Sequence, residues 1–347
     1  MRPKHRGISR SITILLTLCL WACVVADAQQ LPRSLTIGAN PPGAVFYALA
    51  SGLAKFASEG APFQMTVQPY TGTSTFLPLL NTGEIDFGIN NAVDMALAYQ
   101  GPDRLKIGGR NPFQHTPNAR LVMRGSVLLT APLVRKDSPI KTIHDIRGKR
   151  VTGEYPAQLA NWYNLFGYLS GAGMKWEDVK IVPVPGVNEG IDALVQGRAD
   201  VSLCALDAAK VKEADAAVGV RHISMDCSPD GEKRLRRAVP GYYPHWLKRG
   251  QATAVVEDTC MNAYDIYLTS HKGTADRVIS TVLKGIWDNI EKLPPLHPSF
   301  KDWTRQRAVD PDVTLPYHPA AVQYYKERGV WSAALDDAQR KLLSLNP

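Results

Sequence analysis

The sequence predicts an α/β fold of two lobes joined by a hinge, followed by a helical C-terminal region. Short apolar runs typical of strands alternate with helical patterns over most of the 347 residues. This alternation is typical of a mainly parallel sheet covered by helices. A frame of Leu-x-x-Gly-x-x-Asp followed by an apolar run occurs twice, and the chain is longer than one hydrophobic core usually supports.

The N-terminus has the features of an export signal. Basic residues precede an uncharged apolar run from Ile12 to Ala26, which leads into an Ala-x-Ala cleavage site that ends at Ala28. The apolar run of about 15 residues is shorter than the ~20 residues that span a bilayer. We therefore expect residues 1–28 to be removed and a periplasmic mature chain, starting at Gln29, that does not insert into the membrane.

The mature chain is only moderately basic. Its formal charge is 36 − 31 = +5 rather than 40 − 32 = +8, because the leader carries four basic residues and one Asp. The one basic run, from Lys233 to Arg237, lacks the interleaved aromatic side chains on which single-stranded nucleic acid stacks. We expect a solvated helix face there and no nucleic-acid partner.

Element positions follow from the apolar patterns and the turn residues between them. Strands are expected at residues 35–39, 65–69, 86–89, 128–135, 150–153, 179–184 and 200–203. Helices are expected at 45–58, 75–82, 92–99, 159–170 and 189–196, with a one-turn helix at 143–146. After residue 253 the chain is expected to be mostly helical, with its longest helix at 274–290.

The repeated frame predicts two similar lobes. Its copies contain Gly83 with Asp86 and Gly197 with Asp200, and the two Asp residues lie 114 residues apart. In each copy a helix ends on a glycine that can adopt positive φ, and the Asp begins a buried strand. We expect a leader at 1–28, lobe 1 at 29–133, lobe 2 at 134–250, and a return to lobe 1 with C-terminal helices at 251–347.

Cysteine usage fits an oxidising compartment. Cys204, Cys227 and Cys260 follow the leader, and an odd number allows at most one intramolecular disulfide, for which we expect Cys227 with Cys260. Cys204 lies in an apolar run and is expected to be buried. The sequence contains no zinc-type cluster, no H-E-x-x-H pair and no complete nucleophile elbow, so we expect no metal, no cofactor and no enzyme activity.

The stretch "TIGANPPGAVFYALASGLA" at residues 36–54 predicts an anion site. A strand, a glycine turn and a helix start direct free backbone N–H groups toward one ligand. Ala44 and Val45 replace the Lys-Ser/Thr of a P-loop, so we expect a carboxylate rather than a nucleotide. The candidates in this lobe lie in this turn and the next two loops: Asn40, Pro42, Gly43, Phe46, Tyr47, Thr71, Gly72, Thr73, Ser74, Asn90 and Asn91.

The second lobe contributes candidates after two of its expected strands. Glu154, Tyr155 and Gln158 lie where the strand at 150–153 meets its helix, and Asp207 follows the strand at 200–203. In open parallel sheets, ligands bind beyond the carboxyl ends of the strands, where loops of this kind meet. For the candidates in both lobes, helix capping, a turn or core packing is an equally simple structural explanation.

Arg124 is the candidate charged anchor, because a planar guanidinium binds a carboxylate through two hydrogen bonds. A surface position is the alternative. Glu154 either pairs with Arg124 or binds a ligand amine, because an unpaired carboxylate would repel an acid. Tyr243 is a candidate for closing the cleft, with core packing as its alternative.

Two exported α/β lobes with a cleft between them describe a periplasmic binding protein of the type II-like fold. Three segments carry a more specific resemblance: the stretch at 36–54, "VQPYTGTSTFLPLLNTGEIDFGI", and "VRKDSPIKTIHDIRGKRV". Through them the mature chain resembles the TAXI-type solute receptors of TRAP transporters. The resemblance implies capture of a small organic acid by hinge closure and delivery to TRAP permease subunits in the membrane.

Two segments depart from the pattern of that family. "TGEYPAQLANWYN" at 152–164 stands where the family has a Gly-Ser-Gly-Thr-like turn, and "ARLVMRGS" places Arg124 near a usual Tyr. Because both fall in expected pocket walls, the fold transfers from the family more safely than the ligand does. The alternatives are a receptor for an ABC importer of sulfonate or aromatic-acid type, and an exported enzyme on the same scaffold.

Overall fold

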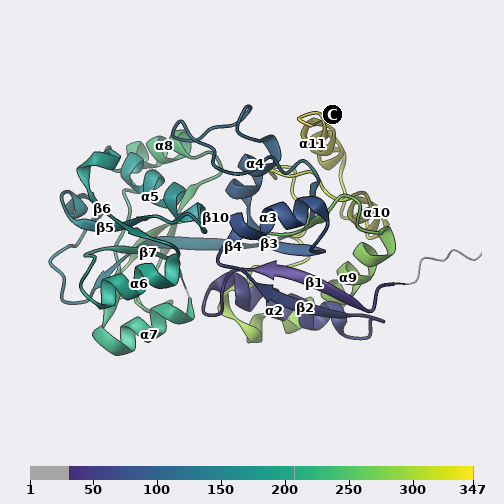
Figure 1. The fold of residues 1–347 in the computed structure, drawn as a ribbon, viewed down its shortest axis with the longest axis horizontal. Helices are drawn as coiled ribbons and strands as arrows, with labels where there is room; N and C mark the ends of the chain where they lie inside the picture. Colours follow the sequence, from purple (N-terminus) through teal and green to yellow (C-terminus); the bar gives the residue numbers. More distant parts are fainter. Residues whose placement is uncertain (1–30, 207, 347) are drawn as a thin grey trace, which may run out of the picture.

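Two α/β lobes lie side by side along the longest axis of the computed structural model (Figure 1). The structure describes residues 31–206 and 208–346, so the predicted leader at 1–28 lies outside the described residues. Within the described ranges, no helix is both long enough and apolar enough to cross a membrane. The α/β class and the arrangement in two lobes agree with the sequence prediction.

The first lobe contains three parallel strands and the C-terminal helices. Its strands are β1 (Ser34–Ala39), β2 (Gln64–Pro69) and β3 (Phe87–Asn91), with β1 paired to both of the others. Its helices are α2 (Val45–Ser58), α3 (Thr73–Thr82), α4 (Ala92–Gln100), α9 (Asp276–Asp288), α10 (Pro319–Glu327) and α11 (Ala333–Leu343). Figure 1 shows α2 and α9 on one side of the strands and α3 and α4 on the other.

The second lobe repeats this pattern with shorter strands. Its strands are β5 (Arg150–Glu154), β6 (Lys180–Val184), β7 (Ser202–Ala205), β8 (Val220–His222) and β9 (Tyr243–Leu247). Its helices are α5 (Ala160–Gly171), α6 (Val187–Val195), α7 (Ala209–Val218) and α8 (Pro229–Ala238), and the expected one-turn helix spans Ile143–Ile146. β5 and β6 are parallel, as in the first lobe.

Two long antiparallel strands connect the lobes: β4 (Ala119–Arg135) and β10 (Thr259–His271). The C-terminal part of β10 pairs with β3 in the first lobe, and its N-terminal part pairs with β9 in the second. The expectation of a mostly helical chain after residue 253 is therefore wrong for β10. This strand is buried on both faces, so it lacks the polar alternation by which a half-exposed strand is recognised.

The repeated frame makes the same backbone contact in both lobes. Asp86 Oδ2 accepts a hydrogen bond from the Thr36 N–H at 2.7 Å, and Asp200 Oδ2 accepts one from the Arg150 N–H at 2.9 Å. In each case the donor lies 50 residues before the Asp. The glycine before each Asp has a positive φ, 81° and 71° respectively. The frame thus joins two strands of each lobe at the same relative position.

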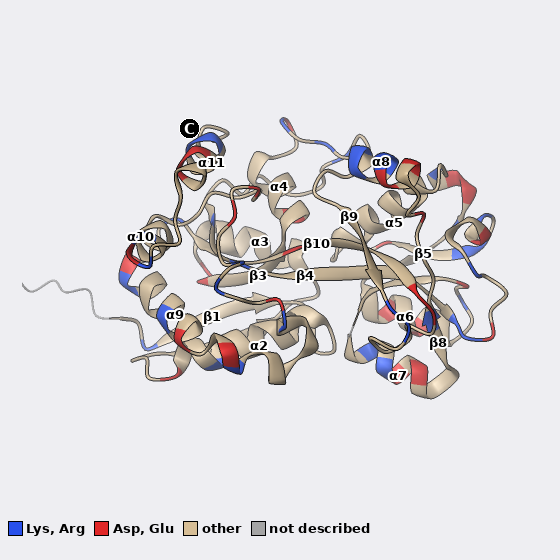
Figure 2. Ribbon diagram, turned by 180° about the vertical axis from the view of Figure 1, so that it is seen from behind, with Lys and Arg blue, Asp and Glu red and all other residues tan. Residues whose placement is uncertain are grey.

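The predicted disulfide is present, and it joins Cys227 to Cys260 at the start of β10. Cys204 is a free and buried thiol, as expected. Charged residues lie mainly on the outer helices and loops (Figure 2). The basic run forms part of α8, where Leu235 is buried while its basic neighbours are exposed. This is the solvated helix face that the sequence indicates.

We expect Asp86→Ala to lower the free energy of unfolding by about 1–3 kcal/mol, because the partly buried Thr36 N–H loses its acceptor. Asp200→Ala should have a smaller effect, since the side chain of its partner Arg150 is 47% exposed and water can replace the lost contact. Urea unfolding of both variants measures the difference. A larger loss for Asp200→Ala would contradict this account of the frame.

Candidate functional site

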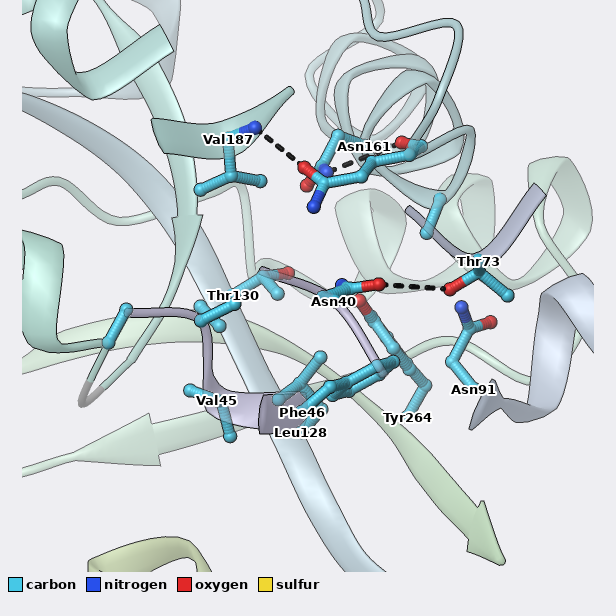
Figure 3. Close-up of a pocket in the computed structure, with 15 residues that line it drawn as sticks. Asn40, Val45, Phe46, Thr73, Asn91, Leu128, Thr130, Asn161, Val187 and Tyr264 are labelled. Atoms are coloured by element: carbon cyan, nitrogen blue, oxygen red, sulfur yellow. Dashed lines mark hydrogen bonds between the residues drawn. The ribbon is translucent and has the colours of Figure 1, made fainter. Parts of the chain in front are cut away.

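A small cavity lies between the lobes (Figure 3). The residues that line it come from the starts of six helices. The first lobe contributes the starts of α2, α3 and α4, and the second contributes the starts of α5, α6 and α7. The cavity has a volume of about 50 Å³. Its lining residues are Asn40, Ala44, Val45, Phe46, Thr73, Asn91, Leu128, Thr130, Gln158, Ala160, Asn161, Val187, Ala205, Ala208 and Tyr264.

The two lobes touch at the rim of this cavity. The Ala209 N–H donates a hydrogen bond to the Gly43 carbonyl at 3.1 Å, and the Ser74 hydroxyl donates one to the Ala157 carbonyl at 2.6 Å. A Cβ atom on Gly72 would lie 1.9 Å from the same Ala157 oxygen, so a side chain at this position would keep the lobes apart. The structure is therefore a closed arrangement of the two lobes.

The start of α2 supplies free backbone donors to the cavity. This helix begins at Val45 and has no side-chain cap, so the first N–H groups, those of Val45 and Phe46, have no acceptor within the helix. Both residues line the cavity. A helix start also carries a partial positive charge, which favours an anion by about 0.3–1 kcal/mol.

Two amide side chains in the wall are held by neighbouring helix starts. Asn91 caps α4, with its Oδ1 accepting the Asp94 N–H at 2.7 Å. Gln158 Oε1 accepts the N–H of Val187, the first residue of α6, at 2.6 Å. Asn40 Oδ1 accepts a longer hydrogen bond from the Thr73 hydroxyl, at 3.5 Å.

A buried polar network supports the wall that faces the second lobe. Thr130 Oγ1 accepts a hydrogen bond from the Tyr168 hydroxyl at 2.6 Å, and the Tyr264 hydroxyl accepts one from Asn164 Nδ2 at 3.4 Å. Tyr242 donates to the other end of Asn164 at 2.8 Å. Burial raises the pKa of Tyr168 and Tyr264 above the usual value, so these hydroxyls remain protonated.

Asp94 is a fully buried acid one helical turn after Asn91. Neither carboxyl oxygen has a hydrogen-bond partner among the described residues. Burial raises the pKa of Asp94 to about 7, and the nearby Asn91 side chain acts in the opposite direction. The acid also faces Tyr163, Tyr242 and Tyr264, whose pKa values it raises further.

The structure brings nine of the predicted site residues together. Asn40, Phe46, Thr73, Asn91 and Gln158 line the cavity, and Pro42, Gly43, Gly72 and Ser74 lie at the rim where the lobes meet. Asp207 lies outside the described residues. The role of these residues in binding stays a prediction, but their clustering fits a site formed by both lobes.

Arg124 does not reach this cavity. Its guanidinium forms ion pairs with Asp265 at 2.8 Å and with Asp310 at 3.3 Å, and it lines a different hollow together with Tyr243. Asp265 and Tyr264 are neighbours on β10, and successive strand residues point to opposite faces. The expectation that Arg124 is a free anchor, or a partner of Glu154, therefore differs from the structure.

Five further candidates also lie elsewhere. Tyr47 lines a hollow on the outer side of α2, and Thr71 is exposed. Asn90 points into the sheet and donates to a buried threonine of β10 at 2.6 Å. Tyr155 is fully buried in the second lobe, and the adjacent Glu154 is exposed. Alternation along a strand and helical rotation turn these side chains away from their neighbours in sequence.

Several lining residues have no distinctive motif in the sequence. Leu128, Thr130 and Tyr264 come from the two crossing strands, whose place beside the cavity depends on the three-dimensional fold. The repeat could have predicted Val187 as a lining residue. Val187 follows Gly186 as Thr73 follows Gly72, and the two pairs are again 114 residues apart. Ala44, Val45, Ala160, Asn161, Ala205 and Ala208 complete the lining residues that the sequence analysis did not include among its site candidates.

The chain has similarity to known proteins at the level of family and fold. The pattern of the NMT1-like family matches residues 37–329. A solved structure described as a periplasmic transporter superposes with a TM-score of 0.55 at 13% identity, covering 91% of this chain and 98% of the other. The periplasmic aliphatic sulphonate binding protein of Escherichia coli gives a TM-score of 0.42 at 16% identity, covering 90% and 86%. No curated protein sequence matches the chain.

We expect Asp94→Asn to stabilise the protein at pH 8 by clearly more than at pH 5. An aspartate in the unfolded chain ionises near pH 4, whereas Asp94 in the folded chain ionises near pH 7. Its contribution to stability is therefore lost as pH rises from about 4 to 7, by at most about 4 kcal/mol. Urea unfolding at both pH values measures this, and an equal effect at both would contradict it.

Arg124→Ala should lower the free energy of unfolding by about 1–3 kcal/mol, because Asp310 and Asp265 lose a charged hydrogen-bond partner while Arg307 still pairs with Asp265. Ligand affinity of the folded variant should stay within a factor of two of the original, since Arg124 does not line the cavity. Urea unfolding and ligand titration separate the two effects. A loss of ligand affinity with unchanged stability would contradict this account and would mean that Arg124 does bind the ligand.

Proposed function

The chain belongs to the NMT1-like family, and from this premise we propose that it is an exported solute-binding receptor of a membrane importer. Its ligand is a small organic acid, a carboxylate or an amino acid, held between the lobes in the periplasm. The observation that carries this proposal is the cavity at which six helices begin. Converging helix starts favour an anion without any covalent chemistry.

Capture proceeds by closure of the lobes about the crossing strands. The ladder between β4 and β10 shifts its register between Asp265 and Tyr267 and again between Leu268 and Thr269. Such irregularities bend a strand locally and are suited to a hinge. A ligand that touches both lobes can make all its contacts only in the closed form, so it shifts the population toward closure.

The membrane partner follows from the resemblance to TAXI receptors, and we assign it as the permease of a TRAP transporter. An ABC importer is the alternative for the same receptor. Uptake by the reconstituted receptor and permease separates them, since TRAP transport requires an ion gradient and ABC transport requires ATP. An exported enzyme on this scaffold would instead convert the bound acid, which product analysis after incubation detects.

A thermal-shift screen of the chain from Gln29 onward tests the receptor function. The panel contains organic acids, aromatic acids, amino acids and alkanesulfonates. A ligand that binds only the native state at 100 times its Kd stabilises it by about 2.7 kcal/mol, so we expect at least one carboxylate to raise the Tm by several degrees. A panel without any stabilising acid would contradict the proposal.

Gly72→Ala should weaken binding of the best acid at least tenfold, because the new Cβ collides with the Ala157 carbonyl and prevents closure. Small-angle scattering should show ligand-induced compaction for the original chain and none for the variant. Gly171→Ala is the matched control, since a Cβ there meets its nearest atom at an ordinary 3.6 Å. If Gly72→Ala bound the acid with the affinity of the original chain, binding would not require closure, and the proposed mechanism of capture would be wrong.

A further inference from the structure

Asn91 presents its NH₂ group to the cavity, because its carbonyl oxygen already accepts a hydrogen bond from a backbone N–H at the start of α4. A flipped amide would place N–H donors against the Asp94 N–H, so the hydrogen bond at 2.7 Å sets the orientation. In Figure 3 the amide nitrogen of Asn91 points toward Thr73 and the amide oxygen points away. Asn91 is 1% exposed, and its Nδ2 has no hydrogen-bond partner among the described residues. A buried donor of this kind needs an acceptor from a ligand or a water molecule.

Gln158 repeats this arrangement from the second lobe. Its Oε1 is held by the Val187 N–H at 2.6 Å, so the opposite side of the amide is again a donor. The side chain is 5% exposed, and its Cγ lies within 2.5 Å of where a Cβ on Gly72 would be. Closure of the lobes therefore brings one oriented amide from each lobe to the same cavity.

The hydroxyl groups of the wall are also hydrogen-bond donors toward the cavity, like the two amides. Thr130 Oγ1 accepts from Tyr168, and the Tyr264 hydroxyl accepts from Asn164. Each hydroxyl therefore keeps its own proton available for an acceptor in the cavity. Together with the free N–H groups at the start of α2, the wall offers several donors that carry no formal charge.

The described part of the lining contains no Lys, Arg or His. Residue 207, which follows the lining residue Ala205 closely in sequence, is an aspartate and so adds no cation. Arg124 is paired in a different hollow. A second carboxylate on a ligand would thus move from water into the site, where no positive charge compensates it. This transfer is strongly unfavourable in an enclosed site.

We propose that the cavity selects a singly charged carboxylate, binds it through the uncharged amides of Asn91 and Gln158, and discriminates against dicarboxylates. This inference rests on the proposed receptor function and narrows its ligand class. The orientation of the two amides is imposed by the starts of α4 and α6. The same contacts that complete the helices thereby define the donors that meet the ligand.

Calorimetric titration at pH 6.5 and low salt tests the selectivity, since most of the Asp94 carboxyl is protonated there. The probes are pairs of equal carbon number: propanoate to hexanoate against malonate to adipate. Two further pairs are 2-oxopentanoate against 2-oxoglutarate, and glutamine against glutamate. We expect the member with one carboxylate in the tightest-binding pair to bind at least tenfold more tightly than its dicarboxylate partner.

The outcomes separate this inference from the receptor function. A preference below tenfold, or tighter binding of a dicarboxylate, overturns the selectivity while the receptor function stands. If no compound of either series binds, the proposed receptor function fails as well. These measurements use the unaltered chain, so they do not depend on whether a variant folds.

Substitutions test the two amides directly, with the best singly charged acid as the probe. Asn91→Asp and Gln158→Glu keep an oxygen for the helix start but replace the NH₂ donor by a negative oxygen, so affinity should fall at least a hundredfold. Asn91→Ser keeps a helix cap without the donor or a charge, and a loss of about tenfold is expected. Affinities equal to that of the original chain would remove both amides from the site.

Gln196→Glu is the matched control for added charge. Gln196 is exposed at the end of α6, and its Oε1 accepts a hydrogen bond from Arg198 at 2.9 Å. The variant adds the same charge outside the cavity and keeps an acceptor for Arg198, so affinity should stay within twofold. A loss equal to that of Gln158→Glu would mean that net charge, not the oriented donor, determines binding.

Discussion

The need of helix starts for hydrogen-bond acceptors determines the chemistry of this site. Six helices begin at one small cavity, and the first N–H groups of a helix have no partner within it. Asn91 and Gln158 satisfy some of these donors with their carbonyl oxygens, which turns their own NH₂ groups toward the cavity. The helix starts thus make the cavity wall a surface of hydrogen-bond donors, and an anion in the cavity can accept hydrogen bonds from them.

This chemistry depends on the two lobes meeting, because each supplies half of the wall. β4 and β10 cross between the lobes as an irregular antiparallel pair, and glycine at position 72 allows the backbones to come into contact at the rim. The repeated Asp frame gives both lobes the same strand and helix framework. The site is therefore assembled by closure, whereas each lobe's framework is held by local contacts of its own.

The sequence predicts the local elements well because their signals are local. Glycine turns, helix caps and apolar spacing locate β1, α2 and the Gly-x-x-Asp frames within a few residues. β10 escapes prediction because burial on both faces removes its alternation. Arg124 and Tyr155 are candidates by position along the chain, but Arg124 is held in another hollow by ion pairs with two acids and Tyr155 is fully buried in the second lobe. Thr130 and Tyr264 belong to the wall only through the crossing of two distant strands.

A crystal structure of the chain with the best singly charged carboxylate is the most direct test of this account. It should show the carboxylate oxygens about 3 Å from Asn91 Nδ2 and Gln158 Nε2, with the lobes in contact at Gly72. A carboxylate bound instead in the hollow beside Arg124, or held by one lobe with the cleft open, would contradict the central claim that converging helix starts and their oriented amides form the binding site.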